Sequence, residues 1–481
     1  MNLFINKAIG HGNSGVEHAQ FYRASCFRKL NVPFKIVLTD LLPELHVHMQ
    51  EWHLSENEVI SLYDYFLSED PNNYLEHGQR VLNDYSEDII SDFTQTQRYI
   101  TRQSTGEFQE QIIKNKKYSE SRKLWIVDDD RIVLSNGVHN ISWHYESIGS
   151  LGTEMVSIHL NNFMGNNYFF ATFSELLLFF YRQLQNHFHS NCYFLDRGVE
   201  NEEVLFELKR QDYDLKIVEI VHAAHLVEYQ GVHPLWNNYY QYMFDHLESV
   251  DMIITATKLQ RDDIRKQIPN LNALQKSHIV AIPVGGVPFV SKARHWSGKA
   301  ARFVTASRLH AEKHIDQIIL AIKQLRDKGL NATLAIYGAG AEESSLKQLI
   351  IENHLQRFVT MAGLSQTMVK DLGKYDAFVS ASYSEGFGLT YIEAIANALP
   401  CASYNNLYGA QELIKDQFNG CLADFERSDQ AVNQNINKLA NAMQQVFDNY
   451  DKLSKGAQHI AEEYKLQTIT QKWGGLLEEL S

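Results

Sequence analysis

Residues 380–394 read SASYSEGFGLTYIEA and join two predicted elements of secondary structure. Asp376–Ser380 has the pattern of a buried strand, and Leu389–Asn397 has the pattern of a helix. Because Gly386 and Gly388 lack side chains, the backbone N–H groups of the intervening loop can approach a ligand closely. The first turn of a helix also favours an anion such as a diphosphate. The stretch therefore predicts an α/β domain that binds a phosphorylated ligand.

Two acids accompany these glycines. Glu385 lies in the loop, and Glu393 follows eight residues later in the second turn of the helix. At this separation one carboxylate can face one end of an elongated ligand while the other faces its far end. Ionised carboxylates accept hydrogen bonds from hydroxyl groups. The pair therefore suits a ligand with hydroxyls at both ends and phosphates between them, and a nucleotide-sugar has this form.

Two earlier strand–loop–helix units carry charges or glycines at the same edge of the predicted sheet. Strand Phe303–Ala306 runs into a loop that contains Arg308 and Lys313. The next strand runs into Gly338-Ala339-Gly340. Open α/β sheets bind ligands at the carboxyl ends of their strands, where arginine offers a fork for phosphate oxygens and lysine a point charge. We therefore expect these loops to form one anion site with the stretch quoted above.

The order of these motifs resembles that of the family 4 retaining glycosyltransferases, in which two glutamates have the spacing of Glu385-x7-Glu393. In the N-terminal half, residues 10–20, 191–201 and 221–240 are similar to family members that O-glycosylate serine-rich adhesins of Gram-positive bacteria. Those members resemble enzymes that attach α-linked sugars to wall teichoic acid. The resemblance covers nearly the whole chain and is weakest over residues 45–190. It implies an α/β protein with the GT-B fold, which has two doubly wound Rossmann-like domains.

The resemblance also implies a role for each site residue. The donor is expected to be UDP-GlcNAc or UDP-glucose, lying in the cleft between the two domains. Arg308 and Lys313 are expected to neutralise the leaving diphosphate, so that neither a metal ion nor another cofactor is required. Glu385 and His222 are expected to contact the sugar, and Glu393 the ribose. The remaining donor contacts are expected from Gly15, Gly338, Gly340, Gly363, Gly386, Phe387, Gly388 and Leu389.

The alternation of strands and helices predicts the domain organisation. Residues 1–44 and 191–295 are expected to form the first Rossmann-like domain, and residues 296–465 the second. Residues 466–481 are a predicted helix that, by the resemblance, crosses back to the first domain. Residues 45–190 contain short runs of alternating polarity separated by turn residues, which indicates an inserted antiparallel sheet.

Three predictions concern local structure. Asp128–Asp130 is expected to be a solvated turn between the strands Leu124–Val127 and Arg131–Leu134, with its Asp-x-Asp pattern leaving a metal site as the alternative. Leu235–Leu247 is expected to be a helix. The apolar stretch Phe169–Tyr181 is too short to span a bilayer and is expected to be a buried amphipathic helix.

The expected acceptor is a serine or threonine of a serine-rich adhesin. The inserted sheet is the expected docking surface for a partner chain that binds the acceptor and lacks the catalytic residues, and a homo-oligomer is the alternative. Poly(glycerol-phosphate) or poly(ribitol-phosphate) is the second acceptor class. For such a polyanion, a basic groove is available from Lys114, Lys116, Lys117, Arg122 and Lys123, which otherwise indicate a solvated loop.

The bulk properties are compatible with this function. The 481 residues carry a formal net charge of −14, which argues against general nucleic-acid binding. The four cysteines have no metal-ligand spacing and are expected to be reduced thiols of a cytoplasmic protein. The N-terminus has neither a cationic start nor a long apolar run, so we expect no signal peptide and at most peripheral association with the inner face of the membrane.

Two other classes of protein remain open. Residues 10–15 (GHGNSG), with Asp40 at the end of the next strand, match a dinucleotide fingerprint and would suit an NAD-dependent oxidoreductase. That interpretation leaves the phosphate-handling residues of the second half unexplained. A non-catalytic binding subunit with the same fold is expected to lack Glu385 or one of the two loop cations, and all three are present.

Overall fold

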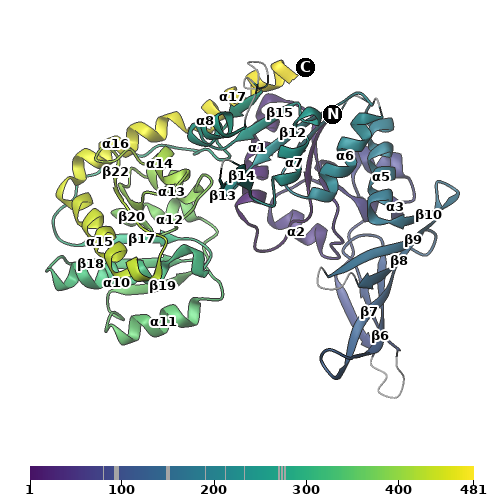
Figure 1. The fold of residues 1–481 in the computed structure, drawn as a ribbon, viewed down its shortest axis with the longest axis horizontal. Coiled ribbons are helices and arrows are strands. Elements are labelled where there is room, and N and C mark those ends of the chain that lie inside the picture. The colour runs from purple at the N-terminus through teal and green to yellow at the C-terminus, as the bar shows by residue number, and fades with distance from the viewer. Residues whose placement is uncertain are drawn as a thin grey trace. The chain divides into compact units, whose positions relative to one another are not determined.

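The structure is a computed structural model that describes residues 1–79, 81–90, 97–147, 152–189, 191–211, 213–231, 233–268, 271, 275 and 278–480. The chain divides into two compact units. Unit 1 comprises residues 1–17, 32–220 and 238–252, and unit 2 comprises residues 18–31, 221–237 and 253–481. Figure 1 shows the ribbon diagram and labels many of the elements of both units.

A parallel sheet of seven strands has the order β16-β15-β12-β11-β1-β2-β3. Parallel sheets are covered on both faces, and Phe4, Ile36 and Val218 are accordingly fully buried. Its strands are β1 (Asn2–Asn6), β2 (Phe34–Leu38), β3 (Val59–Ser61), β11 (Asn191–Leu195), β12 (Leu215–Val221), β15 (Met252–Thr255) and β16 (Ile279–Ala281). The helices of this part of the chain are α1 (Gly15–Leu30), α2 (Leu45–Glu51), α3 (Leu62–Leu67), α4 (Pro71–His77), α5 (Phe173–Phe188), α6 (Val199–Arg210), α7 (Gln241–Asp245) and α8 (Lys258–Gln267).

The predicted antiparallel insertion is confirmed as a sheet of seven strands that pair in chain order. Trp143 and Leu160 from its inner face pack in one core with Phe180 of α5. The domain boundaries remain predictions, although β3 belongs to the parallel sheet and α5 follows the last antiparallel strand. The strands are β4 (Ser86–Ile90), β5 (Gln97–Gln103), β6 (Gln109–Ser119), β7 (Leu124–Ser135), β8 (Asn140–Ser147), β9 (Thr153–Phe163) and β10 (Asn166–Thr172).

The turn predicted at Asp128–Asp130 is wrong, because β7 continues through these residues. β6 pairs with β7 on both sides of the acidic run, and a β-bulge beside Lys114 absorbs one extra residue. The Lys114 ammonium lies 2.9 Å from the Asp129 carboxylate, so a cross-strand ion pair offsets part of the charge. Turn propensity depends on neighbours in the chain, whereas pairing with β6 makes these residues part of a strand.

The helix predicted at Leu235–Leu247 is wrong in its first part. Leu235 and Trp236 belong to β14 (His233–Trp236), which pairs with β13 (Leu226–Gln230) in an antiparallel hairpin, and α7 begins only at Gln241. Strand pairing therefore overrides the helix-like spacing of the aromatic residues. The stretch Phe169–Tyr181 is helical only from Phe173, since the Thr172 hydroxyl accepts the Glu175 N–H and caps α5.

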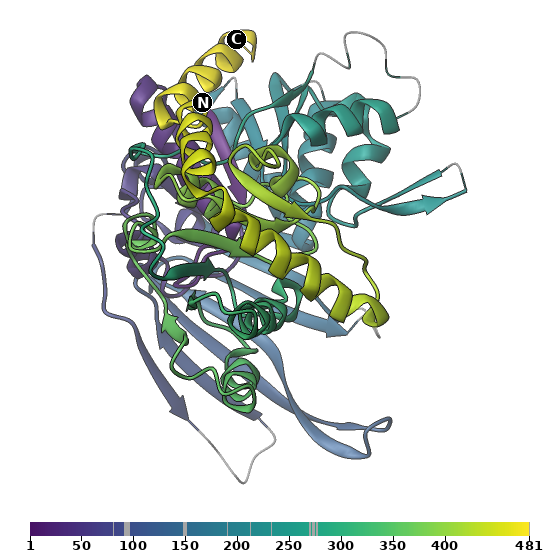
Figure 2. The same ribbon diagram turned by 90° about the vertical axis from the view of Figure 1, so that its left-hand side faces the viewer.

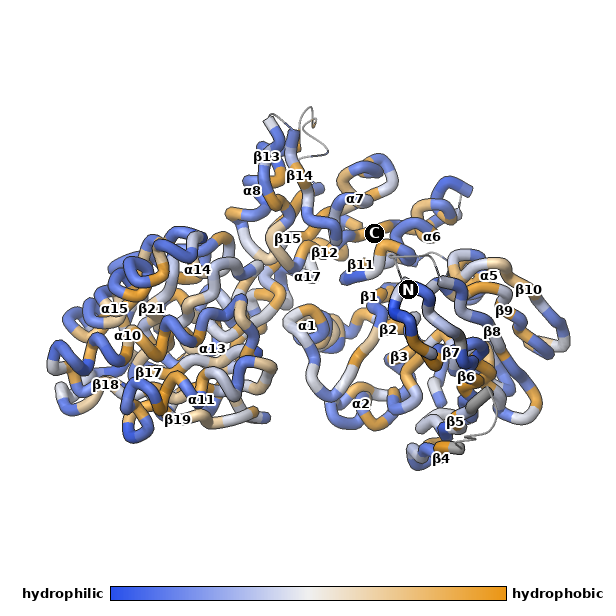
Figure 3. The backbone as a smooth tube through the Cα atoms, turned by 60° about the horizontal axis from the view of Figure 1, so that its bottom comes forward, coloured by the Kyte–Doolittle hydropathy of each residue, from blue (hydrophilic) through white to orange (hydrophobic). Residues whose placement is uncertain are grey.

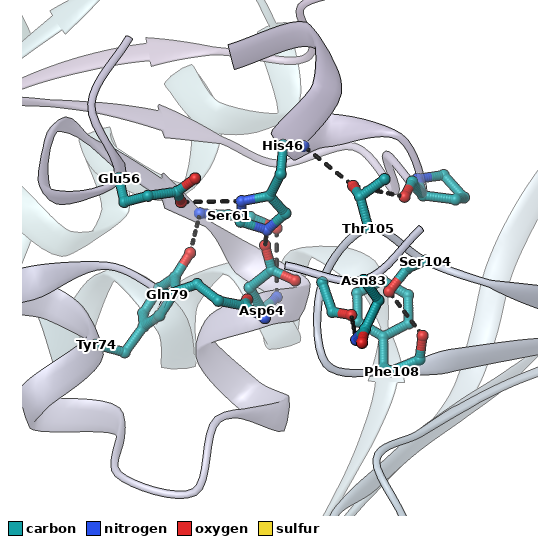
Figure 4. A network of polar contacts seen from close by, with 12 residues as sticks. His46, Glu56, Ser61, Asp64, Tyr74, Gln79, Asn83, Ser104, Thr105 and Phe108 are labelled. Carbon is teal, nitrogen blue, oxygen red and sulfur yellow. Dashed lines mark hydrogen bonds and ion pairs between the residues drawn. The ribbon is translucent and has the colours of Figure 1, made fainter. Parts of the chain in front are cut away.

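A buried histidine anchors the insertion within unit 1 (Figure 4). The His46 ring lies between the carboxylates of Glu56 and Asp64, with nitrogen-to-oxygen distances of 2.9 and 3.2 Å. Burial favours the neutral ring, but these two hydrogen-bonded carboxylates raise the pKa of His46 to about 10. The Thr105 hydroxyl accepts the His46 backbone N–H and donates to the Pro43 carbonyl. The β5–β6 loop is thus held to α2 and α3.

A second parallel sheet forms the core of unit 2, with strand order β19-β18-β17-β20-β21-β22. Helices α10 and α15 pack beside it and alternate between polar and apolar residues (Figure 3). Figure 2 views the same ribbon after a quarter turn. The strands are β17 (Ala301–Ala306), β18 (Ala332–Tyr337), β19 (Val359–Gly363), β20 (Ala377–Ser380), β21 (Cys401–Tyr404) and β22 (Gly420–Ala423). The helices are α10 (Ile315–Asp327), α11 (Glu343–Glu352), α12 (Met368–Leu372), α13 (Leu389–Ala396), α14 (Gly409–Leu413), α15 (Val432–Asp448), α16 (Tyr450–Glu463) and α17 (Leu466–Leu480).

The last helix packs on the first. Trp473 of α17 meets the Phe27 ring of α1 edge-on at 5.8 Å, and the Arg23 guanidinium lies 5.9 Å from the same indole. Within the described residues, every helix is too short or too polar to cross a membrane. The cysteines are free thiols, as predicted, and Cys26, Cys401 and Cys421 are buried.

Candidate active site

Four adjacent strands of the second sheet, β19, β18, β17 and β20, bring most candidate residues to one edge. Arg308 and Lys313 follow β17, the glycine pair follows β18, and Glu385 follows β20. The carboxyl ends of parallel strands meet at the same edge, which is where open α/β sheets bind ligands. Gly15 belongs to unit 1, and every other candidate belongs to unit 2.

The two loop cations differ in their surroundings. The Lys313 ammonium donates a short hydrogen bond to the Glu385 carboxylate, and its side chain is only 15% exposed. The Arg308 guanidinium contacts Glu312 at 3.3 Å, but both side chains are 58% exposed. An exposed pair of this kind contributes little to stability. Arg308 can therefore turn toward a ligand at little cost, whereas Lys313 is already positioned beside Glu385.

A ring stack ties the Lys313 loop to the Glu385 loop. His314 and Tyr383 stack with ring centroids 3.8 Å apart. His314 has a left-handed backbone, with φ of 45°, which is unfavourable for a residue with a side chain. The Tyr383 hydroxyl accepts hydrogen bonds from Gln317 and Asn435, which fix the ring. Sequence reasoning did not single out either partner of the stack, although each is within two residues of a predicted site residue.

The glycines after β18 are required by the packing of neighbouring loops. A Cβ atom at Gly338 would lie 1.9 Å from the Ser307 carbonyl oxygen, and one at Gly340 would lie 2.4 Å from that of Leu309. The Gly338 N–H donates to the Gly363 carbonyl at 2.8 Å, so this amide is already used. The loops after β17, β18 and β19 are therefore locked together, and a contact of these glycines with a nucleotide stays a prediction.

Gly386 brings the Glu385 loop against the backbone of His222. A Cβ atom at Gly386 would lie 2.0 Å from the His222 carbonyl oxygen, so no larger residue fits there. Gly388 has φ of 81° and precedes the first residue of α13. The first N–H groups of a helix have no acceptor within it, and no side chain caps α13. Phe387 is buried against Tyr464, which leaves its backbone rather than its ring for a ligand.

Glu393 is a partly buried acid on α13. Burial raises the pKa of its carboxyl to about 7. No side chain of the described residues donates a hydrogen bond to it. Tyr22 of α1 lies close by, and burial followed by the Glu393 charge raises the pKa of the Tyr22 hydroxyl. A carboxyl with unused acceptors is suited to ligand hydroxyls.

The Gly15 loop contrasts with the glycines of unit 2. A Cβ atom at Gly10, Gly12 or Gly15 would meet nothing within 4 Å, so the fold itself does not demand glycine there. Burial opposes ionisation of Glu17, but hydrogen bonds from Ser14 and Asn6 outweigh it and hold the pKa of Glu17 below its usual range. These bonds fix the start of α1 beside an open surface. Approach of a ligand to Gly15 stays a prediction.

His225 lies behind the Glu385 loop and contacts a residue that is hydrogen-bonded to it. Sequence reasoning gave this histidine no role. Its ring is fully buried and stacks on Tyr408 at 5.7 Å, and one ring nitrogen lies 2.6 Å from the Gln267 side-chain oxygen. Burial lowers the pKa of His225, so the ring is neutral. The Tyr408 N–H donates to the Glu385 carbonyl at 2.6 Å. His225 therefore contacts the Glu385 loop indirectly, through Tyr408.

The described residues contain no group of three or more histidine, cysteine, aspartate or glutamate side chains arranged to hold a metal ion. Arg308 and Lys313 bring positive charge to the site edge, and each lies beside one carboxylate. This edge of the second sheet thus offers two cations, a helix N-terminus and two carboxylates that can accept hydrogen bonds from hydroxyl groups. This combination can position a phosphorylated sugar and stabilise a departing phosphate.

Comparison with known proteins identifies a class of enzyme that fits this site. The Glycosyl transferases group 1 family model matches residues 289–459. The chain is 29% identical to the UDP-N-acetylglucosamine–peptide N-acetylglucosaminyltransferase GtfA subunit of Streptococcus parasanguinis, over 99% of this chain and 98% of that protein. The fold matches the pneumococcal O-GlcNAc transferase GtfA, solved with UDP and GlcNAc, with a TM-score of 0.78, 24% identity and coverage of 100% and 99%. A GtfA/B complex structure matches with a TM-score of 0.75, 25% identity and 99% coverage of both chains.

The fold, the strand-edge site and these similarities define a glycosyltransferase with the GT-B fold. The match to GtfA subunits extends over the full length, including the inserted sheet. The chain is a GtfA-like glycosyltransferase. The predicted resemblance to GT-B glycosyltransferases is thereby confirmed, and neither an oxidoreductase nor a mere binding subunit accounts for these findings.

Proposed function

We propose that this enzyme transfers GlcNAc from UDP-GlcNAc, with retention at the anomeric carbon, to serine or threonine of a serine-rich surface protein. The observation that carries the proposal is the Lys313–Glu385 pair at the edge shared by four strand ends. A lysine for phosphate and a glutamate for sugar hydroxyls stand side by side, as the junction between diphosphate and sugar requires. The relatives' own names point to GlcNAc rather than glucose, which remains the second donor.

Each site residue has one task in this proposal. Arg308 and Lys313 bind the diphosphate, and the N-terminal amides of α13 add hydrogen bonds at Gly388 and Leu389. Glu393 accepts the ribose hydroxyls. The exposed Leu364, directly after Gly363, is available to the nucleobase. Glu385 and the backbone beside His222 hold the sugar.

The reaction needs little from the protein beyond positioning and charge. The bond from the anomeric carbon to UDP breaks while the acceptor hydroxyl forms the new glycosidic bond. Its proton passes to a phosphate oxygen of the departing UDP, so no side chain has to act as base. The two cations stabilise the negative charge on UDP, which is the group that leaves.

A partner chain is the second part of the proposal. A solved GtfA/B complex contains a chain similar to this one, so we expect a GtfB-like partner that binds the acceptor polypeptide. The inserted sheet is the expected docking surface, because none of the predicted donor-site residues lies in its strands. Both chains would work in the cytoplasm. Poly(ribitol-phosphate) or poly(glycerol-phosphate) remains the alternative acceptor.

Donor and acceptor can be tested together. The protein is co-purified with its GtfB-like partner and mixed with a serine-rich peptide, or with poly(ribitol-phosphate), and one of several nucleotide-sugars. We expect UDP-GlcNAc to raise the melting temperature most and to add N-acetylhexosamine to the peptide, as read by mass spectrometry. Transfer only to the polymer would overturn the acceptor, and transfer only from UDP-glucose would overturn the donor.

Chelation of metal ions should leave transfer largely unchanged. Arg308 and Lys313 carry the charge that a divalent ion supplies in metal-dependent transferases, and Asp129 of the Asp-x-Asp run is paired with Lys114. The measurement is the rate of sugar transfer before and after EDTA treatment. Loss of activity that Mn²⁺ or Mg²⁺ restores would contradict the prediction.

A further inference from the structure

Among the described residues, the end of the β6–β7 hairpin has no neighbour in its own sheet. The described part of β5 pairs with β6 over Gln109–Asn115, and that of β8 pairs with β7 over Arg131–Ser135. Beyond these limits, within the described residues, the two strands pair only with each other, from Lys116–Val127 to Ser119–Leu124. Residues 116–127 therefore form a two-stranded projection of unit 1, which we call the ribbon (Figures 1 and 2).

The ribbon exposes large apolar side chains near its tip. Trp125 is 59% exposed, Leu124 48% and Tyr118 46%. Tyr118 and Trp125 face each other across the strands, with ring centroids 5.5 Å apart. An isolated two-stranded ribbon has only marginal stability in water, and these two exposed rings are not buried in a hydrophobic core. Tryptophan and tyrosine in such a place are typical of the boundary between water and lipid headgroups.

The same tip is cationic on an acidic protein. Residues 116–125 contain Lys116, Lys117, Arg122 and Lys123 against Glu120 alone, a net charge of +3, whereas the whole chain carries −14. The Lys116 ammonium lies 5.5 Å from the Trp125 ring centroid. Lys116, Arg122 and Lys123 form no ion pair with any described residue. Basic side chains close to a bilayer are attracted by anionic headgroups.

We propose that the ribbon docks on an anionic lipid bilayer, with Trp125, Tyr118 and Leu124 entering the headgroup layer and the basic residues contacting phosphates. This surface goes beyond the sugar-transfer site. A phosphate polymer in solution would meet the cations but leave the apolar side chains exposed. A convex tip also offers no groove to an extended peptide. Charge and apolar surface together fit a bilayer best.

Vesicle flotation with the full-length protein tests the proposal. The probes are vesicles of phosphatidylcholine alone and of phosphatidylcholine with an equal share of phosphatidylglycerol. We expect the wild type to bind the anionic vesicles at least tenfold more strongly, and high salt to weaken this binding. The double variants Tyr118→Ser/Trp125→Ser and Arg122→Glu/Lys123→Glu should each lose at least tenfold. Phe169→Ser is the matched control, because Phe169 of β10 is also 59% exposed and lies in the same sheet.

All variants should keep the melting temperature and the rate of UDP-GlcNAc hydrolysis of the wild type, because the ribbon contains no residue of the donor site. Equal binding of neutral and anionic vesicles, absence of binding by the wild type, or full binding by both double variants overturns the proposal. Loss of the GtfB-like partner from the double variants, with vesicle binding unchanged, would assign the ribbon to a protein interface and overturn it as well.

Discussion

Replacing Lys313 with alanine should lower turnover by about a hundredfold to a thousandfold, which is the usual cost of removing one preorganised contact to a developing charge. Arg308→Ala should cause a loss of the same order. The ammonium of Lys313 already lies beside Glu385, so no other described side chain can take its place without rearrangement. Initial rates with UDP-GlcNAc and acceptor give turnover, and thermal melting verifies the fold.

The appropriate control is Lys323→Ala. Lys323 lies on α10, just after the site loop, and forms an exposed pair with Asp327. That pair resembles the one between Arg308 and Glu312 in spacing and exposure, so its removal matches the charge change without touching the site. Near-normal turnover in both Arg308→Ala and Lys313→Ala, with the control also normal, would remove the basis for the diphosphate assignment.

Glu393→Gln should weaken UDP binding and stabilise the unliganded protein. The carboxylate is expected to accept two ribose hydroxyls, and hydrogen bonds to a charged group are each worth about 1.5–3 kcal/mol. A loss of at least tenfold in UDP affinity at pH 8 is therefore expected from titration calorimetry. Glu352→Gln, at the exposed end of α11, is the control and should bind UDP like the wild type.

The stability change of Glu393→Gln has a defined pH window. The ordinary pKa of a glutamate carboxyl is 4.5, and the pKa of Glu393 in the folded protein is about 7. Because the folded state holds the proton more tightly, wild-type stability falls as pH rises through this interval and stays lower above it. The cost above pH 7 is about 3 kcal/mol, and glutamine should remove it. UDP affinity of the wild type should fall as pH drops below about 7. If Glu393→Gln leaves the melting temperature at pH 8 unchanged, the buried Glu393 carboxylate does not lower the stability of the wild type.

Much of the fold could be predicted because its signals are local. The strand before Ser380, the glycine loop and the helix from Leu389 each have the pattern of their own type, and the structure has them within one residue. The continuation of the strand through Asp128–Asp130 could not be predicted in the same way. There the deciding interaction is with β6, ten or more residues away in the chain, and local turn propensity gave the wrong answer.

The candidate site likewise has features that local sequence predicts and features that depend on distant residues. The residue types at the strand ends identified Arg308, Lys313 and Glu385, because parallel strands bring their ends together. The reason for Gly386 could not be seen in its own neighbourhood, since its constraint is a carbonyl more than 160 positions earlier, at His222. The stack of His314 on Tyr383 likewise depends on the meeting of two loops. Packing between distant loops leaves little trace in a single sequence.

The chain-order pairing of the inserted sheet has an evolutionary consequence. All seven strands lie in one continuous segment, and their described residues pair with no strand of either parallel sheet. Such a segment can be lengthened, trimmed or exchanged between homologues as a cassette, while the donor-binding machinery is inherited unchanged. The point of attachment is what must coevolve: a new cassette has to present a hydroxyl like that of Thr105 to the backbone N–H of His46, or the graft leaves that buried donor without an acceptor. Under the docking proposed above, acceptor choice can then diversify faster than the sugar-transfer chemistry.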